Sequence, residues 1–346
     1  MTPISTIDIA PLFGGELDAC ARVDGEIARA AFDIGFMTVI GHPADLAVGP
    51  VECAVLLKLL SLPVAEQRRL WKRNFAPENT NLYRGWFPLE WSGARNREGF
   101  EIGPDIVRPL PEDGHGDLLY EPTPLPDLAL LPDGWLDTAR SYYLGMEDIG
   151  HRILASLSRS LGIDEHILRD AFDDGISTLR LLNYPKRPAD QPAPQDVPER
   201  FVEFNGQRVE QVARAHVDSG LLTVLAKCGV DGLQARNSNG DWIDVPPRDD
   251  GSAINFGGLL ERWSGRRVKA TAHRVIGLGH ERFSVPFFFE PRPSTRIEPL
   301  PIPGIRPFAS FLYGDHLWAT TTKFPENFGL AELRPARAPY SDPLAI

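Results

Sequence analysis

The first half of the chain mixes short apolar runs with segments of helical spacing. Residues 5–13 and 35–41 carry the apolar pattern of short strands. Between them, apolar positions recur every three to four residues over 16–33, which predicts an amphipathic helix. The same spacing predicts further helices at 50–61, 64–72 and 134–161. The segment 81–105 is rich in aromatic residues and glycine, and we expect it to be irregular.

The pattern changes near residue 176, where short β-type segments begin. The first, 177–185, ends at a proline and leads into 186–211, which is rich in proline and charge and is expected to be a loop. Turn signals such as NSNGD and DDG then separate closely spaced strand patterns. These predicted strands are 221–227, 232–236, 241–245, 252–256, 268–276 and 282–290. The tail contains one helix-compatible stretch, 311–324.

Many short strands separated by turns are typical of a sandwich or a jelly roll. We therefore predict an α+β protein with a mainly β core, in which a helix-rich N-terminal half packs against a double-stranded β-helix (jelly roll). The expected regions are an N-terminal part at 1–175, the jelly-roll core at 176–292 and a C-terminal tail at 293–346. Neither half carries a linker that would let it separate, so the regions are expected to form one structural unit.

Composition narrows the choice of partners. The chain has 346 residues, of which 42% are hydrophobic and 24% charged, as in globular proteins with a sizeable core. Its formal net charge of -11 argues against broad binding to nucleic acid phosphates. No apolar run approaches the roughly 20 residues that cross a bilayer, and the N-terminus lacks the pattern of a signal peptide. We expect a cytoplasmic protein that acts on a small molecule, and no pattern indicates its oligomeric state.

The cysteines agree with that expectation. Cys20, Cys53 and Cys228 are odd in number and far apart, so they form neither a disulfide framework nor a CxxC metal site. This usage is typical of a reducing compartment, where isolated cysteines most often serve as small buried apolar residues.

Three potential metal ligands fall in the β-rich half. His216 and Asp218 are two residues apart, so their side chains would point the same way on an extended backbone. His273 lies in a separate predicted strand. Two imidazoles and a carboxylate on one face form the triad of non-haem Fe(II) oxygenases, and Zn²⁺ could bind the same set. On its own, an HxD sequence is more often a histidine that caps a strand followed by an aspartate that caps a turn than a metal site, so the hypothesis depends on His273.

A second polar set follows in the last predicted strand. Arg282 and Ser284 share one face of that strand, and a guanidinium beside a hydroxyl can hold a carboxylate. Tyr184, at the end of another predicted strand, could donate to the same carboxylate. A metal site alone needs no such clamp. Together the two sets predict a site for a metal ion and a dicarboxylate.

The motifs HVDSGLLTVL, GLQ, INFG, HRV and RFSVPFF occur in that order. They resemble the isopenicillin N synthase-like superfamily of Fe(II)/2-oxoglutarate dioxygenases. IDIAPL and GFMTVIGH resemble the non-haem dioxygenase N-terminal region of that superfamily, so the resemblance covers nearly the whole chain. The sequence departs from the family at 41–43, where GHP stands in place of the frequent NHG, which puts only the local turn in doubt.

The resemblance implies an enzyme that uses Fe(II), 2-oxoglutarate and O₂. It would oxidise an unactivated C–H bond of a small molecule by hydroxylation, desaturation or cyclisation, while 2-oxoglutarate becomes succinate and CO₂. The implied iron ligands are His216, Asp218 and His273. The implied 2-oxoglutarate residues are Arg282, Ser284 and Tyr184. By resemblance to substrate-side segments, YRGWFP and GFEIGP offer Arg84, Trp86 and Phe100, although such a segment is equally typical of a structural lid.

Other functions fit the residues less well. An oxidase of the isopenicillin N synthase type would use O₂ without 2-oxoglutarate and would hold a substrate carboxylate on the same arginine and serine. Such oxidases end in a glutamine-containing tail, whereas the last glutamine here is Gln234. A zinc hydrolase would leave the clamp unexplained, and an inactive binding module would not need the ligand set. No GxGxxG follows a predicted strand, which disfavours a nicotinamide or flavin dehydrogenase.

Overall fold

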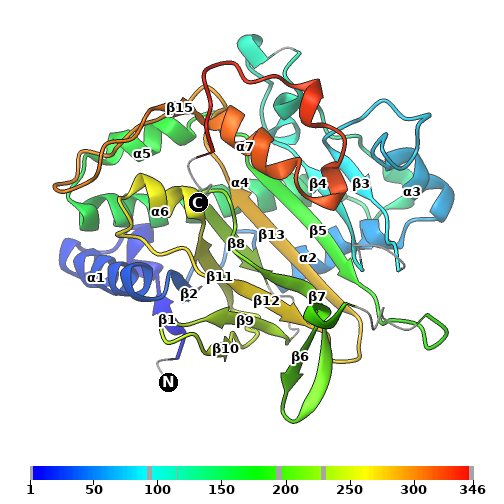
Figure 1. Cartoon of the computed structure of the whole chain (residues 1–346), viewed down its shortest axis with the longest axis horizontal. Helices are drawn as coiled ribbons and strands as arrows, with labels where there is room; N and C mark the ends of the chain where they lie inside the picture. Colours follow the sequence, from blue (N-terminus) through cyan, green and yellow to red (C-terminus); the bar gives the residue numbers. More distant parts are fainter. Residues whose placement is uncertain (1–2, 92–95, 115, 192–196, 227–230, 343–346) are drawn as a thin grey trace.

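Two β-sheets with a cavity between them form the centre of the molecule (Figure 1). This computed structural model describes residues 3–91, 96–114, 116–191, 197–226 and 231–342. The larger sheet has the order β1 (Ser5–Asp8), β2 (Phe36–Ile40), β11 (Gly251–Phe256), β8 (Leu222–Ala226), β13 (Arg282–Phe289), β5 (Thr178–Tyr184), β4 (Glu98–Ile102) and β3 (Gly85–Phe87). The smaller sheet has the order β10 (Trp242–Asp244), β9 (Leu233–Arg236), β12 (His273–Ile276), β7 (Gln207–His216) and β6 (Phe201–Phe204).

Except for the parallel pair β1–β2, the neighbours in both sheets run antiparallel. A separate short ribbon joins β14 (Arg296–Ile297) to β15 (Phe311–Leu312). The predicted jelly roll with helices packed against it is thus confirmed.

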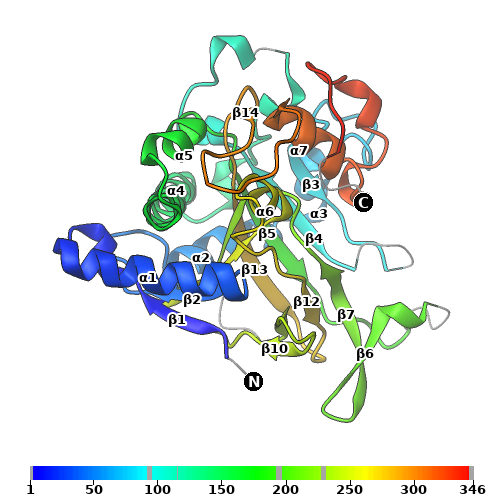
Figure 2. The same cartoon turned by 60° about the vertical axis from the view of Figure 1, so that its left-hand side comes forward.

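Helices cover the outer face of the larger sheet (Figure 2). On the sheet side, Phe287 packs edge-on against Tyr143 with 4.9 Å between ring centroids, and Phe289 stacks on Phe172 at 4.4 Å. Since side chains alternate along a strand, the intervening residues of β13 face the cavity instead. The helices of this layer are α1 (Leu17–Asp33), α2 (Pro50–Leu57), α4 (Trp135–Leu161) and α5 (Glu165–Phe172).

The remaining helices are α3 (Val64–Leu70), α6 (Gly258–Trp263) and α7 (Tyr313–Thr321). None of the helices in the described ranges is long and apolar enough to span a membrane. Cys20 and Cys53 take part in no disulfide within the described residues, and Cys228 lies outside them.

Two of the expected loops are wrong. The segment 81–105 contains β3 and β4, which extend the larger sheet beyond β5. The segment 186–211 contains β6 and the first half of β7, which form a hairpin. The turn of that hairpin is Asn205–Gly206, with φ of 50° and 73°. Asn-Gly is a strong signal for a tight hairpin turn, and it stood in the sequence among residues that otherwise suggested a loop.

Other differences are smaller. The helices α5 and α6 were not predicted, and the predicted strand 268–276 is regular only over β12. The predicted helices at 16–33 and 134–161 match α1 and α4 to within one residue at each end. The long helix ends at Gly162, whose φ of 69° is the left-handed conformation that commonly terminates helices.

A buried lysine, Lys72, connects the N-terminal half to the C-terminal tail. Lys72 is fully buried, and its Nζ lies 2.6 Å from Glu101 on β4 and donates to Asn327 at 2.8 Å. Glu101 also forms an ion pair with Arg180 on β5. Burial alone would raise the pKa of Glu101, but Lys72 and Arg180 outweigh it and lower that pKa to about 2.

The substitution Lys72→Met tests the importance of this connection. It leaves Glu101 with one cation fewer in a buried setting, so we expect a loss of about 3–5 kcal/mol in the free energy of unfolding, measured by urea denaturation at neutral pH. Lys58→Met, on an exposed side chain, should change it little. Because the pKa of Glu101 falls from 4.5 to about 2 on folding, its contribution is present above pH 4.5 and is lost as the pH falls toward 2. Equal stabilities for the two variants would contradict the prediction.

Candidate active site

The space between the sheets is a cavity of about 340 Å³, within the range of small-molecule sites. Both sheets contribute to its wall, because each presents every second residue of its inner strands. The polar lining residues are Asn96, Arg97, Arg180, Tyr184, Arg200, Gln211, Arg214, His216, Asp218, Thr223, Asn255, His273, Arg282 and Ser284.

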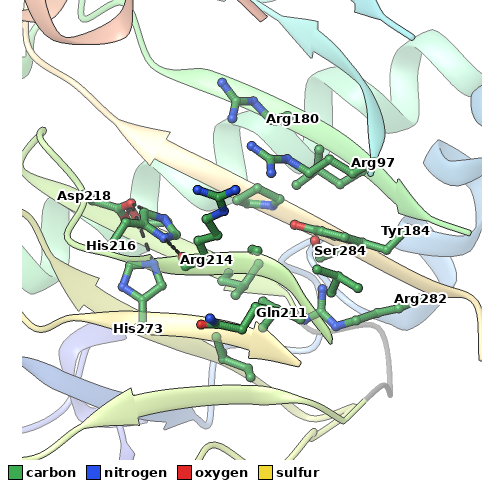
Figure 3. A pocket seen from close by; sticks show the side chains of 18 of the residues that line it. Arg97, Arg180, Tyr184, Gln211, Arg214, His216, Asp218, His273, Arg282 and Ser284 are labelled. Atoms are coloured by element: carbon green, nitrogen blue, oxygen red, sulfur yellow. Dashed lines mark hydrogen bonds and ion pairs between the residues drawn. The ribbon is translucent and has the colours of Figure 1, made fainter. Parts of the chain in front are cut away.

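The three predicted metal ligands lie together at one end of this cavity (Figure 3). His216 ends β7 and pairs directly with His273, which begins β12. Asp218 Oδ1 lies 3.6 Å from His216 Nε2 and 3.7 Å from His273 Nε2. One ligand atom from each residue falls within 4.8 Å of the other two. This is the spacing of three donors that can share one cation.

Neighbouring groups orient all three donors. The Nδ1 of His216 lies 2.7 Å from the carbonyl oxygen of Arg214, and the Nδ1 of His273 lies 3.2 Å from that of Thr271. A proton on each Nδ1 leaves each Nε2 lone pair directed at Asp218. The Oδ2 of Asp218 accepts hydrogen bonds of 2.7 Å from Thr223 and from Asn255. Its Oδ1 is thereby left for a metal ion.

Charge and burial prepare the same groups for a cation. Burial alone would raise the pKa of Asp218, but the two histidines and Thr223 hold that pKa far below its usual range. Burial lowers the pKa of His273 more than Asp218 raises it. For His216, the hydrogen bond and charge of Asp218 reverse the effect of burial and raise the pKa. An ionised carboxylate with two imidazole nitrogens is a donor set that fits Fe(II).

The local backbone differs from the simple expectation of one extended strand. His216 is the last residue of β7, and Asp218 lies in the turn that leads to β8. In addition, the register between β7 and β12 shifts here. His216 pairs with His273 and Ala213 pairs with Val275, so β7 has one residue more than β12 between these two pairs. The extra residue is a β-bulge, which lets both Ala213 and His216 face the cavity.

The predicted clamp lies on the larger sheet. Arg282 and Ser284 occupy the inner face of β13, and Tyr184 pairs with Arg282 from β5. The guanidinium of Arg282 lies 5.2 Å from the centroid of the Tyr184 ring. Figure 3 shows the hydroxyl groups of Tyr184 and Ser284 in the cavity, with the three metal-ligand candidates at the opposite end. The structure thus brings both predicted sets into one space.

The three substrate-side candidates do not line the cavity. Arg84 is buried and donates to Thr178 at 2.6 Å. Trp86 and Phe100 are fully buried and pack on each other across β3 and β4, with 6.3 Å between ring centroids. The structure places all three in the protein interior, where they support the sheet.

Sequence analysis missed the arginines that do line the cavity, Arg97, Arg180, Arg200 and Arg214. A signal was present for two of them. Arg180 lies four residues before Tyr184 and would share its face on an extended strand, and Arg214 lies two residues before His216. Neither arginine belongs to the motifs that carried the resemblance.

Comparison with known proteins agrees with this geometry. Residues 178–291 match the family model of the 2OG-Fe(II) oxygenase superfamily. The chain is 28% identical to the 2-oxoglutarate-Fe(II) type oxidoreductase hxnY of Emericella nidulans, over 85% of this chain and 81% of that protein. It is 27% identical to isopenicillin N synthase of Amycolatopsis lactamdurans, over 86% and 87% of the two chains.

Solved structures show the same fold. A full-length protein of Neurospora crassa, in complex with alpha-KG and thymine, superposes with a TM-score of 0.74 at 22% identity, over 93% of this chain and 97% of that one. In sequence the chain is thus similar to the 2OG-Fe(II) oxygenase superfamily over residues 178–291, and to a 2-oxoglutarate-Fe(II) type oxidoreductase and an isopenicillin N synthase over more than four fifths of its length. The enzymes of this superfamily are oxidoreductases, and the cofactors of this chain are accordingly Fe(II), 2-oxoglutarate and O₂.

Metal binding tests the assignment of the three donors. We expect the protein to bind a single Fe(II) under anaerobic conditions, and His273→Ala to bind none at concentrations that saturate the unaltered protein. Asn255→Ala removes one of the two hydrogen bonds that Asp218 Oδ2 accepts and should weaken Fe(II) affinity about 10- to 100-fold. Competition with a coloured chelator measures these affinities. Asn239→Ala, on an exposed side chain, serves as the control, and unchanged affinity in His273→Ala would refute the assignment.

Proposed function

We propose that the protein oxidises a C–H bond of a small molecule with Fe(II), 2-oxoglutarate and O₂, with hydroxylation as the simplest outcome. One oxygen atom would enter the substrate as C–OH and the other would enter succinate, with release of CO₂. The observation that carries the proposal is the single cavity that joins a two-histidine, one-carboxylate set to an arginine–serine–tyrosine set.

His216, Asp218 and His273 would hold Fe(II), which supplies the site at which O₂ is reduced when 2-oxoglutarate is bound. A set of only three protein donors would leave the metal able to take further ligands from the cavity. Thr223 and Asn255 would fix the carboxylate so that only one of its oxygens is directed at the metal. This pre-orientation lowers the cost of assembling the site, because few rotamers remain to be ordered.

Arg282 and Ser284 would bind the carboxylate of 2-oxoglutarate that lies away from the metal, with Tyr184 as a further donor. A guanidinium is suited to this role because it donates two parallel hydrogen bonds and keeps its charge when buried. The side chain is 4% exposed, and the Tyr184 ring beside it limits its movement.

The rest of the wall is largely apolar and would exclude water. Phe36 lies edge-on to His273, with 6.1 Å between ring centroids. The apolar lining also includes Leu182, Leu225, Leu233, Val275 and Pro286. A water-poor cavity strengthens the electrostatic hold on a dianion and protects reactive species from side reactions.

An oxidase that uses O₂ alone is the second candidate, because isopenicillin N synthase is among the similar proteins. In that case the clamp would hold a substrate carboxylate. The two candidates differ in one product, since only the first forms succinate.

Succinate formation therefore tests the proposal. Protein reconstituted anaerobically with Fe(II) and then given O₂ and isotope-labelled 2-oxoglutarate should release labelled succinate. Arg282→Gln removes the charge of the clamp and should weaken the affinity for 2-oxoglutarate roughly a hundredfold, equivalent to about 3 kcal/mol. Arg306→Gln, on an exposed side chain, should leave it unchanged. Absence of succinate from the loaded protein, with and without candidate substrates, would refute a 2-oxoglutarate-dependent reaction.

A further inference from the structure

We propose that the substrate carries a carboxylate, which binds to Arg214 and Arg97 in the cavity beside the metal-ligand set. This inference rests on the proposed function and names the substrate class of that site. Figure 3 shows Arg97, Arg180 and Arg214 together on one side of the cavity, while Arg282 lies apart from them. They come from three segments: the approach to β4, the middle of β5 and the end of β7.

The three arginines differ in how far the protein already neutralises them. Arg180 forms ion pairs with Glu101 and, at 3.5 Å, with Glu326. Within the described part of the chain, the one ion pair of Arg97 is a long contact of 3.6 Å with the same Glu326. Charge-assisted hydrogen bonds are typically 2.7–2.9 Å, so donors of Arg97 remain for a ligand. Arg214 forms no ion pair with any residue that the structure describes.

The side of the cavity that contains Arg97, Arg180 and Arg214 carries a net positive charge. Glu101 and Glu326 are shared among Lys72, Arg97 and Arg180, so these five groups together carry one positive charge. Arg214 adds another. This surplus occurs in a chain whose formal net charge is -11. A cavity of one sign in a protein of the other sign indicates a ligand of complementary charge.

Fe(II) and 2-oxoglutarate would not neutralise the positive charge around Arg214 and Arg97. Fe(II) and Arg282 together bring three positive charges, and Asp218 with the two carboxylates of 2-oxoglutarate brings three negative ones. The metal and clamp region is thus neutral when loaded. The positive charge around Arg214 and Arg97 is left for the second organic ligand.

Position supports the same conclusion. Arg214 stands two residues before His216, and its carbonyl oxygen faces His216 Nδ1 at 2.7 Å. Both Arg214 and His216 line the cavity at the end of β7. A carboxylate held there would fix its own carbon skeleton close to the metal. The Phe288 ring lies 4.9 Å from the guanidinium of Arg180, and Phe324 also lines the cavity, so apolar surface is present that suits an acid with an apolar body.

Matched pairs of acids and amides test the proposal. The probes are hexanoate, benzoate and 3-phenylpropanoate, each with its primary amide, titrated calorimetrically into the anaerobic Fe(II)-loaded protein at saturating 2-oxoglutarate. Saturation keeps the probes away from Arg282. We expect at least one acid to bind tenfold or more tightly than its amide. Arg214→Gln and Arg97→Gln should each reduce that ratio about tenfold by weakening the acid alone, and Arg214→Lys should retain part of it.

Arg208→Gln is the matched control, because Arg208 is an exposed arginine on the same strand and does not line the cavity. The proposal is overturned if no acid binds more tightly than its amide, or if Arg214→Gln behaves like Arg208→Gln. Arg214 is exposed, so its replacement should not impair folding. Succinate formation in the Arg282 experiment is measured without these probes, so the proposed function and the substrate class can fail separately.

Discussion

The register between β7 and β12 is the constraint on which the site depends. It sets His216 directly opposite His273, and the turn after His216 then returns Asp218 to the same place. A slip by one residue would send one imidazole to the other face of the smaller sheet. The bulge in β7 lets both Ala213 and His216 face the cavity, and Arg214 between them also lines it. The end of β7 therefore supplies both a metal donor, His216, and a cation of the cavity wall, Arg214.

The larger sheet has helices packed on one face and the cavity on the other. Along β13, Val285, Phe287 and Phe289 are less than 2% exposed and face the helices. The residues between them present a guanidinium and a hydroxyl to the cavity. The helix layer therefore has a function beyond stability. By packing the apolar face tightly, it holds the polar face of the same strands in fixed positions, which is the support that a preorganised site requires.

Period-two alternation explains why much of this could be predicted from the sequence. The strand patterns around 177–185 and 282–290 indicated which residues share a face, and they placed Tyr184, Arg282 and Ser284 correctly in one cavity. Alternation does not say which sheet a strand joins. The aromatic segment with Trp86 and Phe100 suggested a binding loop, but these two side chains fill the interior at the sheet edge, whereas Asn96 and Arg97 of the same segment line the cavity. Burial at that edge depends on partners far away in sequence, such as Lys72 with Asn327.

The cationic wall was missed for a related reason. An arginine in a sequence gives no sign of whether a carboxylate will neutralise it, because that depends on tertiary contacts. Arg180 and Arg214 look alike in the sequence, yet one forms two ion pairs and the other lies without one among the described residues. The difference appears only when strands β4, β5 and β7 and the tail around Glu326 are assembled. The motifs of a superfamily carry the reaction that its members have in common. The charge that remains in the assembled cavity influences which substrate can bind there.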